Sequence, residues 1–243
     1  MVHPAALIKA SLNAGRELLR MPPKPLDEPA PQSKPSVIVP IRSLGPSHRE
    51  RIAAHLLSLD PSDRYLRFGY AASDVQVQHY VDHLDFERDE IFGIYNRRLT
   101  LIAMAHLAFS PDPKCEACAE FGVSVLKTAR GRGYGARLFE RAVIHARNEN
   151  VNLLFIHALT ENTVMLKIAR NAGALVERNG PESDAYLKLP PADLDSRMTE
   201  IVEEHFAQTD YRLKVQAKQF WDFLATLQEV RSGVREGRHK SAG

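Results

Sequence analysis

The sequence predicts an α/β protein in which a central sheet is flanked by helices and followed by a C-terminal helical extension. Three patterns support this prediction. Residues 120–125 alternate apolar and polar side chains as a strand does, a glycine-rich turn follows at 130–135, and apolar side chains recur at helical spacing over 136–146. Two apolar runs, 90–95 and 101–109, are separated by a turn short enough for a hairpin. Strands of this kind, mixed with helices, indicate a sheet covered by helices.

Four segments are expected along the 243 residues. Residues 1–35 are predicted to be an N-terminal extension, made of a short amphipathic helix and a proline-rich linker. The folded domain is predicted at 36–190, where a Pro-Pro pair ends it. A long run of apolar residues at helical spacing predicts a helical extension at 191–230, and the basic, glycine-containing residues 231–243 are predicted to form a flexible tail.

Within the domain, each expected element follows from a local pattern. Pro40 favours an edge position for the first strand, 36–44, and Ser47 can cap the helix that follows. Asp74 is expected to cap a second helix, with Asp63 to Gly69 as the connection between the two. Beyond the central strand, turn and helix, the remaining elements are expected as a strand at 151–159, a helix after Asn162, and short strands at 175–176 and 185–189.

Composition and net charge limit the kinds of partner and ligand that the protein is expected to bind. The formal net charge is +2 at pH 7, too small to indicate a nucleic-acid or membrane partner, and no apolar run is long enough to cross a bilayer. The ten histidines show no metal-ligand spacing, so no metal site is expected. Cys115 and Cys118 lack a second ligand pair and are expected to be a reduced structural pair, which fits a cytoplasmic protein.

The glycine-rich turn has the chemistry of an anion site. A helix N-terminus presents unpaired N–H groups and a partial positive charge, which attract an anion such as phosphate. Gly131, Gly133 and Gly135 let the backbone approach a ligand closely, and Arg130 and Arg132 add positive charge. The same pattern also fits an ordinary tight turn between a strand and a helix.

Two common nucleotide motifs do not fit this turn. A dinucleotide fingerprint needs its first glycine at the end of the strand and an acidic residue about 20 residues later. Several residues separate Val125 from Gly131, and the next strand is still apolar where that carboxylate should lie. A phosphate-binding loop of the Walker type fails as well, because no Gly-Lys-Ser/Thr sequence follows.

The turn resembles the pyrophosphate loop of the GNAT family of N-acetyltransferases. Arg130 to Gly135 is similar to the family's R/Q-x-x-G-x-G/A loop, and Val123 and Val125 match the V-x-V strand before it. Asn162 to Ala174 is similar to the family's second motif, so that two motifs stand in the expected order. The resemblance spans about 36–189 and is closest to the bacterial branch that acetylates protein lysines.

The resemblance implies a fold and a co-substrate. The fold would be a mixed, mostly antiparallel sheet flanked by helices, and the co-substrate acetyl-CoA, with no metal. The residues that match cofactor-binding positions are Val123, Val125, Arg130, Gly131, Arg132, Gly133, Tyr134, Gly135 and Asn162. Asn162 is also well suited to cap the next helix, and both roles are compatible.

The same resemblance suggests the side on which the acetyl group is accepted. The sequence around Tyr65, Arg67 and Phe68 is similar to a Y-x-R-F stretch that lines the acceptor site in one branch of the family. These three residues are therefore candidates for acceptor binding. Alternatively, Tyr65 and Phe68 pack in the core and Arg67 pairs with a carboxylate.

Acetyl transfer to an amine needs a neutral amine, and Glu120 is the candidate general base. Its placement is similar to that of the glutamate in the protein-lysine branch, and its apolar neighbours in the sequence suggest burial that would raise its pKa. Its alternative role is a carboxylate paired with an arginine. A backbone N–H of the strand at Val123–Val125 would polarise the thioester oxygen.

One position departs from the family pattern. The tyrosine that usually protonates the departing thiolate is replaced by Ala169, so that role is not carried over. Either the thiolate leaves without a dedicated acid or another group serves, with Tyr186 and Tyr65 as candidates. The CoA thiol resembles a free cysteine, with a pKa of about 8.5, so unassisted departure is chemically reasonable.

Two functions are consistent with these features. The first is an acetyl-CoA-dependent N-acyltransferase that acts on a small-molecule amine or a protein lysine. The alternative is a non-catalytic acyl-CoA-binding regulatory module, which the alanine at position 169 favours. The apolar stripe of the C-terminal extension must be buried on something, either on the domain or in a homodimer.

Overall fold

The computed structural model describes residues 39–110 and 117–240, so the expected N-terminal extension at 1–35 lies outside the described part. The strands are β1 (Arg42–Ser43), β2 (Glu90–Tyr95), β3 (Leu101–Phe109), β4 (Cys118–Val125), β5 (Leu153–Leu159), β6 (Leu175–Asn179) and β7 (Glu182–Lys188). The helices are α2 (Arg49–Leu57), α3 (Pro61–Phe68), α4 (Asp74–Asp82), α5 (Tyr134–Asn148), α6 (Thr163–Asn171) and α7 (Leu194–Lys240), with 3-10 turns at Pro46–His48 and Lys127–Ala129.

The strands form one mixed sheet in the order β1-β2-β3-β4-β5-β7-β6, which confirms the expected fold class. All neighbouring strands are antiparallel except β4 and β5, which run parallel. Their pairing covers three positions and ends where Glu120 faces Phe155. Beyond that point each strand continues with a partner on its outer side alone, so the sheet opens in its middle.

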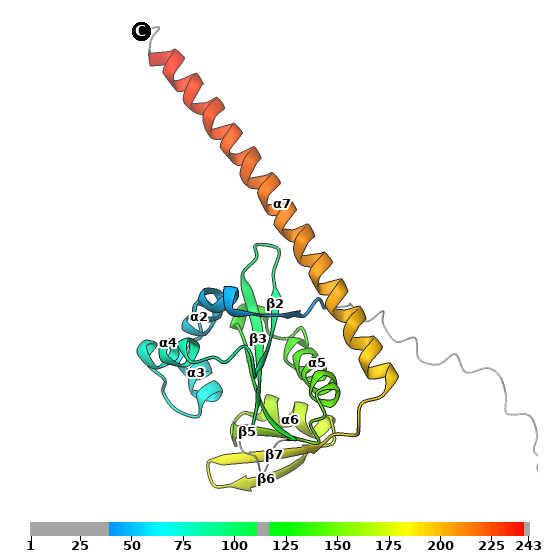
Figure 1. Ribbon diagram of the computed structural model, residues 1–243. Helices are drawn as coiled ribbons and strands as arrows, with labels where there is room; N and C mark the ends of the chain where they lie inside the picture. Colours follow the sequence, from blue (N-terminus) through cyan, green and yellow to red (C-terminus); the bar gives the residue numbers. More distant parts are fainter. Residues whose placement is uncertain (1–38, 111–116, 241–243) are drawn as a thin grey trace, which may run out of the picture. The chain divides into compact units, whose positions relative to one another are not determined.

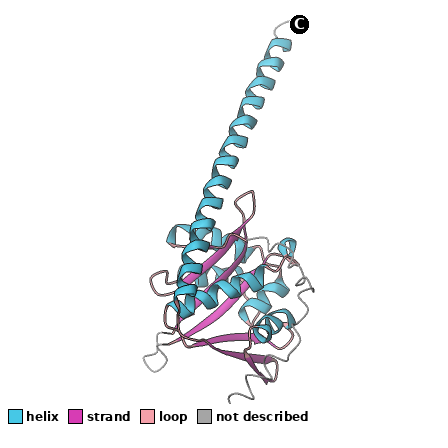
Figure 2. Ribbon diagram, turned by 90° about the vertical axis from the view of Figure 1, so that its right-hand side faces the viewer, coloured by secondary structure: helices cyan, strands magenta, loops and turns pink. Residues whose placement is uncertain are grey.

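Helices cover both faces of the sheet (Figures 1 and 2). On one face, α5 and α6 pack buried side chains such as Leu138 and Leu166 against the strands. On the other, α2 and α4 contribute Ile52, Leu56 and Val77 to a second buried cluster. Burial of each such side chain contributes about 1.5–3 kcal/mol, so the two clusters fix where the helices lie around the opening.

The segment expected as a connection after the first helix is itself a helix, α3. Asp60 caps it by accepting a hydrogen bond from Asp63 N at 2.9 Å, and Pro61 occupies its first turn. It ends at Gly69, whose φ of +78° is the left-handed conformation that favours glycine. Because the segment is helical, Tyr65 and Arg67 point in different directions instead of lining one extended strand.

α7 turns its polar side toward the domain. Arg141 of α5 is 3% exposed and lies near Glu200, Glu203 and Glu204 of α7, while Lys214 donates to Tyr95 O at 3.0 Å. Ala207 is buried and Tyr211 packs against the second cluster, but six large apolar residues of this stretch are exposed: Leu194, Met198, Ile201, Val202, Phe206 and Leu213. The helix continues to Lys240 and so includes most of the segment that was expected to be a flexible tail from residue 231.

Two further expectations concern cysteine and metal. Cys118 is disulfide-bonded, so the expected reduced pair is wrong; the other cysteine of the chain, Cys115, lies outside the described residues. Among the described residues, no group of three or more His, Cys, Asp or Glu side chains is placed to hold a metal ion. Within the same residues, no helix combines the length and apolar character that crossing a membrane requires.

Candidate active site

A cavity of about 550 Å³ lies between the end of β4, the glycine-rich turn and the start of α6. β4 contributes Val123 and Val125 to its wall, and Asn162 stands at the start of α6. The glycine-rich turn and the beginning of α5 complete this side with Arg130, Gly131, Gly133, Tyr134, Gly135 and Ala136. The structure therefore brings together eight of the nine residues expected to bind the cofactor. Arg132 is exposed and is not among the lining residues.

The turn has the backbone geometry of an anion site. Gly131 and Gly133 both have a φ of +76°, and Gly133 is the N-cap of α5, where no side chain caps the helix. The first N–H groups of α5 therefore keep their hydrogen-bonding capacity for a ligand. A Cβ at Gly135 would lie 3.4 Å from Ile168 Cδ1, so glycine there also leaves room between α5 and α6.

Arg130 is fixed by a partner that the sequence did not reveal. Its guanidinium forms an ion pair with Asp63 of α3, and its Nε donates weakly to Val125 O at 3.4 Å. The Asp63 side chain is 7% exposed, whereas that of Arg130 is 47% exposed. Arg130 thus connects α3 to the end of β4 and still presents part of its charge to solvent at the cavity rim.

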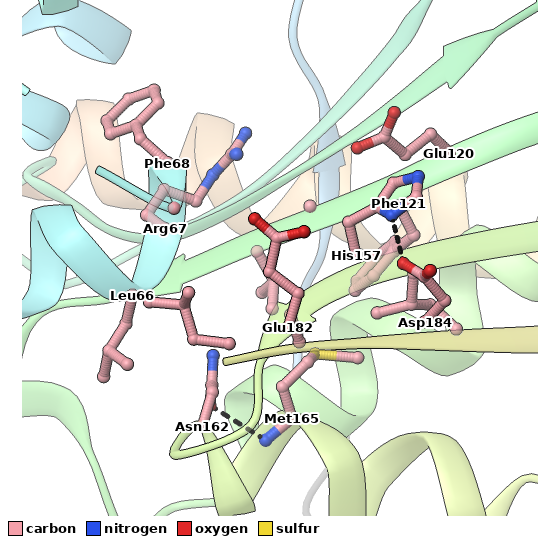
Figure 3. Close-up of a pocket in the computed structure, with 16 residues that line it drawn as sticks. Leu66, Arg67, Phe68, Glu120, Phe121, His157, Asn162, Met165, Glu182 and Asp184 are labelled. Carbon is pink, nitrogen blue, oxygen red and sulfur yellow. Dashed lines mark hydrogen bonds and ion pairs between the residues drawn. The ribbon is translucent and has the colours of Figure 1, made fainter. Parts of the chain in front are cut away.

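A second cavity of about 330 Å³ adjoins the first and contains two of the three acceptor-side candidates (Figure 3). Arg67 and Phe68 enter from α3, and Glu120 enters from β4. Glu182 and Asp184 of β7 add two carboxylates, with Asp184 accepting a hydrogen bond from His157 Nδ1 at 2.5 Å. Sequence reasoning missed Glu182 and Asp184, because the strand expected at 185–189 begins after both. In β7 their spacing of two residues places them on one face.

Five of the described residues line both cavities: Leu66, Arg67, Val123, Asn162 and Met165. Asn162 caps α6, because its Oδ1 accepts a hydrogen bond from Met165 N at 3.2 Å. The capping role expected for Asn162 is therefore confirmed, and its side chain also stands at the junction of the cavities. Among these five, Arg67 has the one charged side chain.

Several expectations about individual side chains are not met. Glu120 is exposed, so the burial expected from its apolar neighbours is not found. Tyr65 is 38% exposed and lines neither cavity, and Tyr186 lies outside both as well. Ala169 of α6 is fully buried in the core, and its methyl group has no proton to donate.

Arg67 belongs to a chain of hydrogen bonds that crosses three elements. Its Nη2 donates to the Tyr80 hydroxyl at 2.9 Å, and that hydroxyl lies 2.6 Å from His106 Nδ1. His106 Nε2 lies 3.0 Å from Asp89 Oδ2, and Arg88 and Phe109 N donate to the same carboxylate. Burial opposes the ionised form, but hydrogen bonds from His106 and Arg88 lower the pKa of Asp89 to about 2. Burial raises the pKa of Tyr80, so this phenol stays protonated at neutral pH.

A second pair of polar side chains, His55 and Ser124, joins α2 to β4 by a hydrogen bond. His55 of α2 is 2% exposed, and burial lowers its pKa to about 4, so the ring is neutral at pH 7. Its Nδ1 lies 2.9 Å from Leu101 O, which accepts, so its Nε2 accepts from the Ser124 hydroxyl at 2.8 Å. The pair fixes β4 against β3 and α2 at the level of the first cavity.

Comparison with protein families places this site in a known class. The family model described as the acetyltransferase (GNAT) family matches residues 56–174. That range contains α3, the opened pair of strands, the glycine-rich turn and α6. A search of curated proteins found no match.

Solved structures share the fold at low sequence identity. The GNAT domain of S. lividans PAT has a TM-score of 0.54 and 20% identity, over 63% of this chain and 95% of that chain. A GNAT acetyltransferase from Kribbella flavida has a TM-score of 0.52 and 17% identity, over 63% and 98%. Spermidine N-acetyltransferase from Vibrio cholerae, solved with CoA and spermine, has a TM-score of 0.50 and 17% identity, over 62% and 95%.

The family match covers most of the residues that line the two cavities, and Glu182 and Asp184 lie outside it. Residues 56–174 match the family model, and the sheet with its flanking helices is the GNAT fold. Through these residues the chain belongs to the GNAT family of acetyltransferases.

Proposed function

We propose that the protein is an acetyl-CoA-dependent N-acyltransferase that moves an acetyl group from the CoA thioester to an amine. The amine is a small molecule or a protein lysine. The observation that carries this proposal is the meeting of two unlike cavities at Arg67, Val123 and Asn162. One begins at an uncapped helix N-terminus and suits a phosphorylated molecule, and the other contains three carboxylates and suits an ammonium group.

The first cavity fits acetyl-CoA. The pyrophosphate would bind the N–H groups of residues 131–135, with Arg130 and Arg132 supplying charge at the rim. The pantetheine arm would follow the opening between β4 and β5 past Asn162. Backbone N–H groups of β4 that do not pair with β5 would bind the thioester oxygen.

The second cavity fits the acceptor amine. A lysine-like ammonium has a pKa of about 10.4, so making it neutral at pH 7 costs roughly 4–5 kcal/mol, and a general base reduces that cost. Glu120 is proposed as this base, because it lines the acceptor cavity on the strand that leads to the cofactor turn. Glu182 and Asp184 would attract and orient the ammonium group before it loses its proton.

A second function has one observation in its favour. Ala169 is fully buried at the position where the family has a catalytic tyrosine. This replacement supports a non-catalytic acyl-CoA-binding module, whose ligand state would regulate a partner. The acidic acceptor cavity supports the enzyme instead, because a module that binds acyl-CoA alone has no need of it.

Two measurements separate these functions. Calorimetric titration with CoA and acetyl-CoA should show binding, and its absence would refute both functions. Release of free thiol from acetyl-CoA should then be followed with a panel of amines that contains lysine peptides, spermidine and spermine. Acyl transfer to any member, confirmed by mass spectrometry, establishes the enzyme. Binding with no thiol release across the panel supports the module.

We further propose that the protein acts in the cytoplasm and forms a homodimer through α7. Acetyl-CoA carries several phosphate charges and does not cross a membrane unaided, which supports the location. The disulfide bond of Cys118 is evidence against it, because disulfides are rare in the cytoplasm. The exposed apolar residues of α7 support the homodimer. Cell fractionation with an antibody against the protein tests the location.

A further inference from the structure

Arg67 stands where the two proposed substrates must meet. An acetyl group can pass from a donor in the first cavity to an amine in the second only at the boundary that both share. Arg67 is the charged residue among the five described residues that line this boundary. Its position therefore places a fixed positive charge beside the atoms that exchange the acetyl group.

The guanidinium lies flat against the backbone of β4. A Cβ at Gly122 would lie 2.8 Å from Arg67 Cζ, so the glycine is what allows this close approach. The same Cζ lies 5.2 Å from the centre of the Phe68 ring and 5.5 Å from that of Tyr80. Arg67 Nε is buried without a hydrogen-bond partner among the described residues, so the group keeps donor capacity.

The hydrogen-bond chain behind Arg67 has a single consistent direction. Asp89 accepts from His106 Nε2–H, which makes Nδ1 the acceptor of the Tyr80 O–H. The Tyr80 oxygen is then available to accept from Arg67 Nη2. The bond from Nη2 to Tyr80 restricts the orientation of the guanidinium, while Nε keeps its donor capacity.

We propose that Arg67 stabilises the CoA thiolate as it leaves, in place of the tyrosine that Ala169 replaces, with Tyr80 and His106 as positioning residues. This inference rests on the proposed N-acyltransferase function. In the step itself, the amine nitrogen forms a bond to the acetyl carbon and the carbon–sulfur bond breaks. The electron pair of that bond stays on sulfur as a thiolate, and the proton of the amine goes to Glu120.

A cation is sufficient for this role because the leaving group is already acidic. A thiol with a pKa of about 8.5 needs charge stabilisation, and not full protonation, to leave near neutral pH. An opposite charge within about 4–6 Å typically lowers such a pKa by about 1–3 units. Burial is the main cause of the lowered pKa of His55, and the nearby positive charge of Arg67 lowers it further.

Other charged groups around the junction of the two cavities would raise or lower the pKa of the bound thiol. The titratable groups that face Arg67 or line the second cavity with it are Tyr80 of α4, His55 of α2, His106 of β3, Glu120 of β4, His157 of β5, and Glu182 and Asp184 of β7. In the first cavity they are Asp63 of α3, Arg130 of the glycine-rich turn and Tyr134 of α5. The carboxylates would raise the pKa of a thiol placed among them. The direction in which the pKa of the bound thiol shifts therefore shows whether Arg67 lies closer to the sulfur than the carboxylates do.

The test measures the thiol pKa of bound CoA, which needs no acceptor. The ultraviolet absorbance of the thiolate is followed against pH for the complex of the full-length protein with CoA, and CoA affinity is measured alongside by calorimetry. In the wild-type complex, the thiol pKa should lie below the value of free CoA. Arg67→Gln should raise it by about one unit or more. Arg67→Lys keeps the charge but loses the bond to Tyr80, so the thiol pKa in this variant should lie between the values of the wild type and of Arg67→Gln.

Two more variants separate position from charge. Tyr80→Phe removes the bond that orients Arg67 and should raise the thiol pKa by less than Arg67→Gln does. Gly122→Ala should act in the same direction, because the new Cβ displaces the guanidinium. Arg170→Gln, at an exposed position of α6 outside both cavities, is the matched control and should leave the thiol pKa unchanged.

The outcomes distinguish this inference from the function on which it rests. If CoA binds but its thiol pKa equals that of free CoA, or is the same in wild type and Arg67→Gln, the role of Arg67 is refuted while the proposed function stands. If CoA does not bind to the folded wild-type protein, both fail. Should Arg67→Gln not fold, as judged by circular dichroism, Arg67→Lys and Tyr80→Phe still decide the question.

Discussion

Arg141 of α5 and Glu200 of α7 form a nearly buried ion pair, with 3.1 Å between Arg141 Nη1 and Glu200 Oε1 and no aligned hydrogen bond between them. Glu203 and Glu204 lie at 3.8 and 3.5 Å from the same guanidinium. Removing this cation leaves three neighbouring carboxylates, of which Glu200 alone keeps a pairing with His145. We expect Arg141→Ala to destabilise the protein by about 3 kcal/mol, measured as the free energy of unfolding in urea.

Arg137→Ala is the control for this substitution. Arg137 lies one turn earlier on α5 in an exposed pair with Glu140, and removal of an exposed pair costs less than about 1 kcal/mol. Equal losses for the two variants would show that the contact between α5 and α7 does not form in solution.

The same contact predicts a dependence on pH. Burial opposes ionisation of Glu200, but hydrogen bonds from His145 and Asn148 lower its pKa to about 2. Its contribution is therefore complete above the unfolded value of about 4.3 and is lost as the pH falls toward 2. Burial would lower the pKa of His145, but the bond to Glu200 raises it, so its contribution is lost as the pH rises through the folded value.

Stability from this pair should thus be greatest between about pH 4.3 and 6.5. The urea midpoint of the wild type should fall on either side of that window. Glu200→Gln should flatten the profile on both sides of this window. It removes the carboxylate whose pKa is lowered, and with it the hydrogen bond that raises the pKa of His145. A wild-type profile that Glu200→Gln leaves unaltered would assign the pH dependence to other groups.

Gly133→Ala tests the backbone geometry of the glycine-rich turn. Nothing lies within 4 Å of a Cβ at this position, so the cost comes from the φ of +76°, which alanine adopts at about 1 kcal/mol or more. We expect weaker CoA binding, because relaxation of this residue turns the first N–H groups of α5 away. Gly45→Ala, with a φ of −100° and equally open surroundings, should change neither stability nor binding.

Glu120→Gln tests the proposed base. The side chain is exposed, so the substitution should leave the fold intact while kcat falls by about 10²–10⁴-fold. CoA affinity should stay at the wild-type value, because Glu120 lines only the acceptor cavity among the two described. Glu177→Gln, at an exposed position of β6, is the control in a thiol-release assay with the best amine of the panel. Full activity in Glu120→Gln would refute the role of Glu120 as the general base.

The exposed face of α7 predicts a homodimer. Phe206 and Leu213 are seven residues apart, and the sequence continues this interval at 220, 227 and 234 with Phe, Leu and Val, which is the spacing of a coiled coil with a second copy of the chain. Light scattering after gel filtration should give the mass of two chains. Phe206→Glu combined with Leu213→Glu should reduce it to one, whereas Gln208→Ala should not. A wild-type mass of one chain would refute the homodimer.

Local patterns were enough to predict much of the sheet and the cofactor cavity. The hairpin of β2 and β3, the strand–turn–helix unit and the cap at Asn162 each depend on residues close together in the chain. α3 was not predicted, although Asp60 and Pro61 are a helix-start signal, because a helix of eight residues is too short for its apolar spacing to recur.

The parts that could not be predicted depend on residues far apart in the chain. The chain from Arg67 through Tyr80 and His106 to Asp89 exists because α3, α4 and β3 meet on one face of the sheet. Arg141 lies within the apolar stripe of α5, where no local rule suggests that α7 supplies its carboxylates. Exposure of Glu120 likewise depends on where the neighbouring strands separate.

The separation of β4 from β5 leaves two strand edges in the interior of a sheet. Strand edges with free N–H and C=O groups are templates for pairing with other chains, and proteins usually cover them. Here the cover would be a small molecule that completes the hydrogen bonding between two halves of the sheet. The supply of that molecule in the cell would then influence how well the chain resists aggregation, because a ligand that binds the folded state stabilises it by mass action.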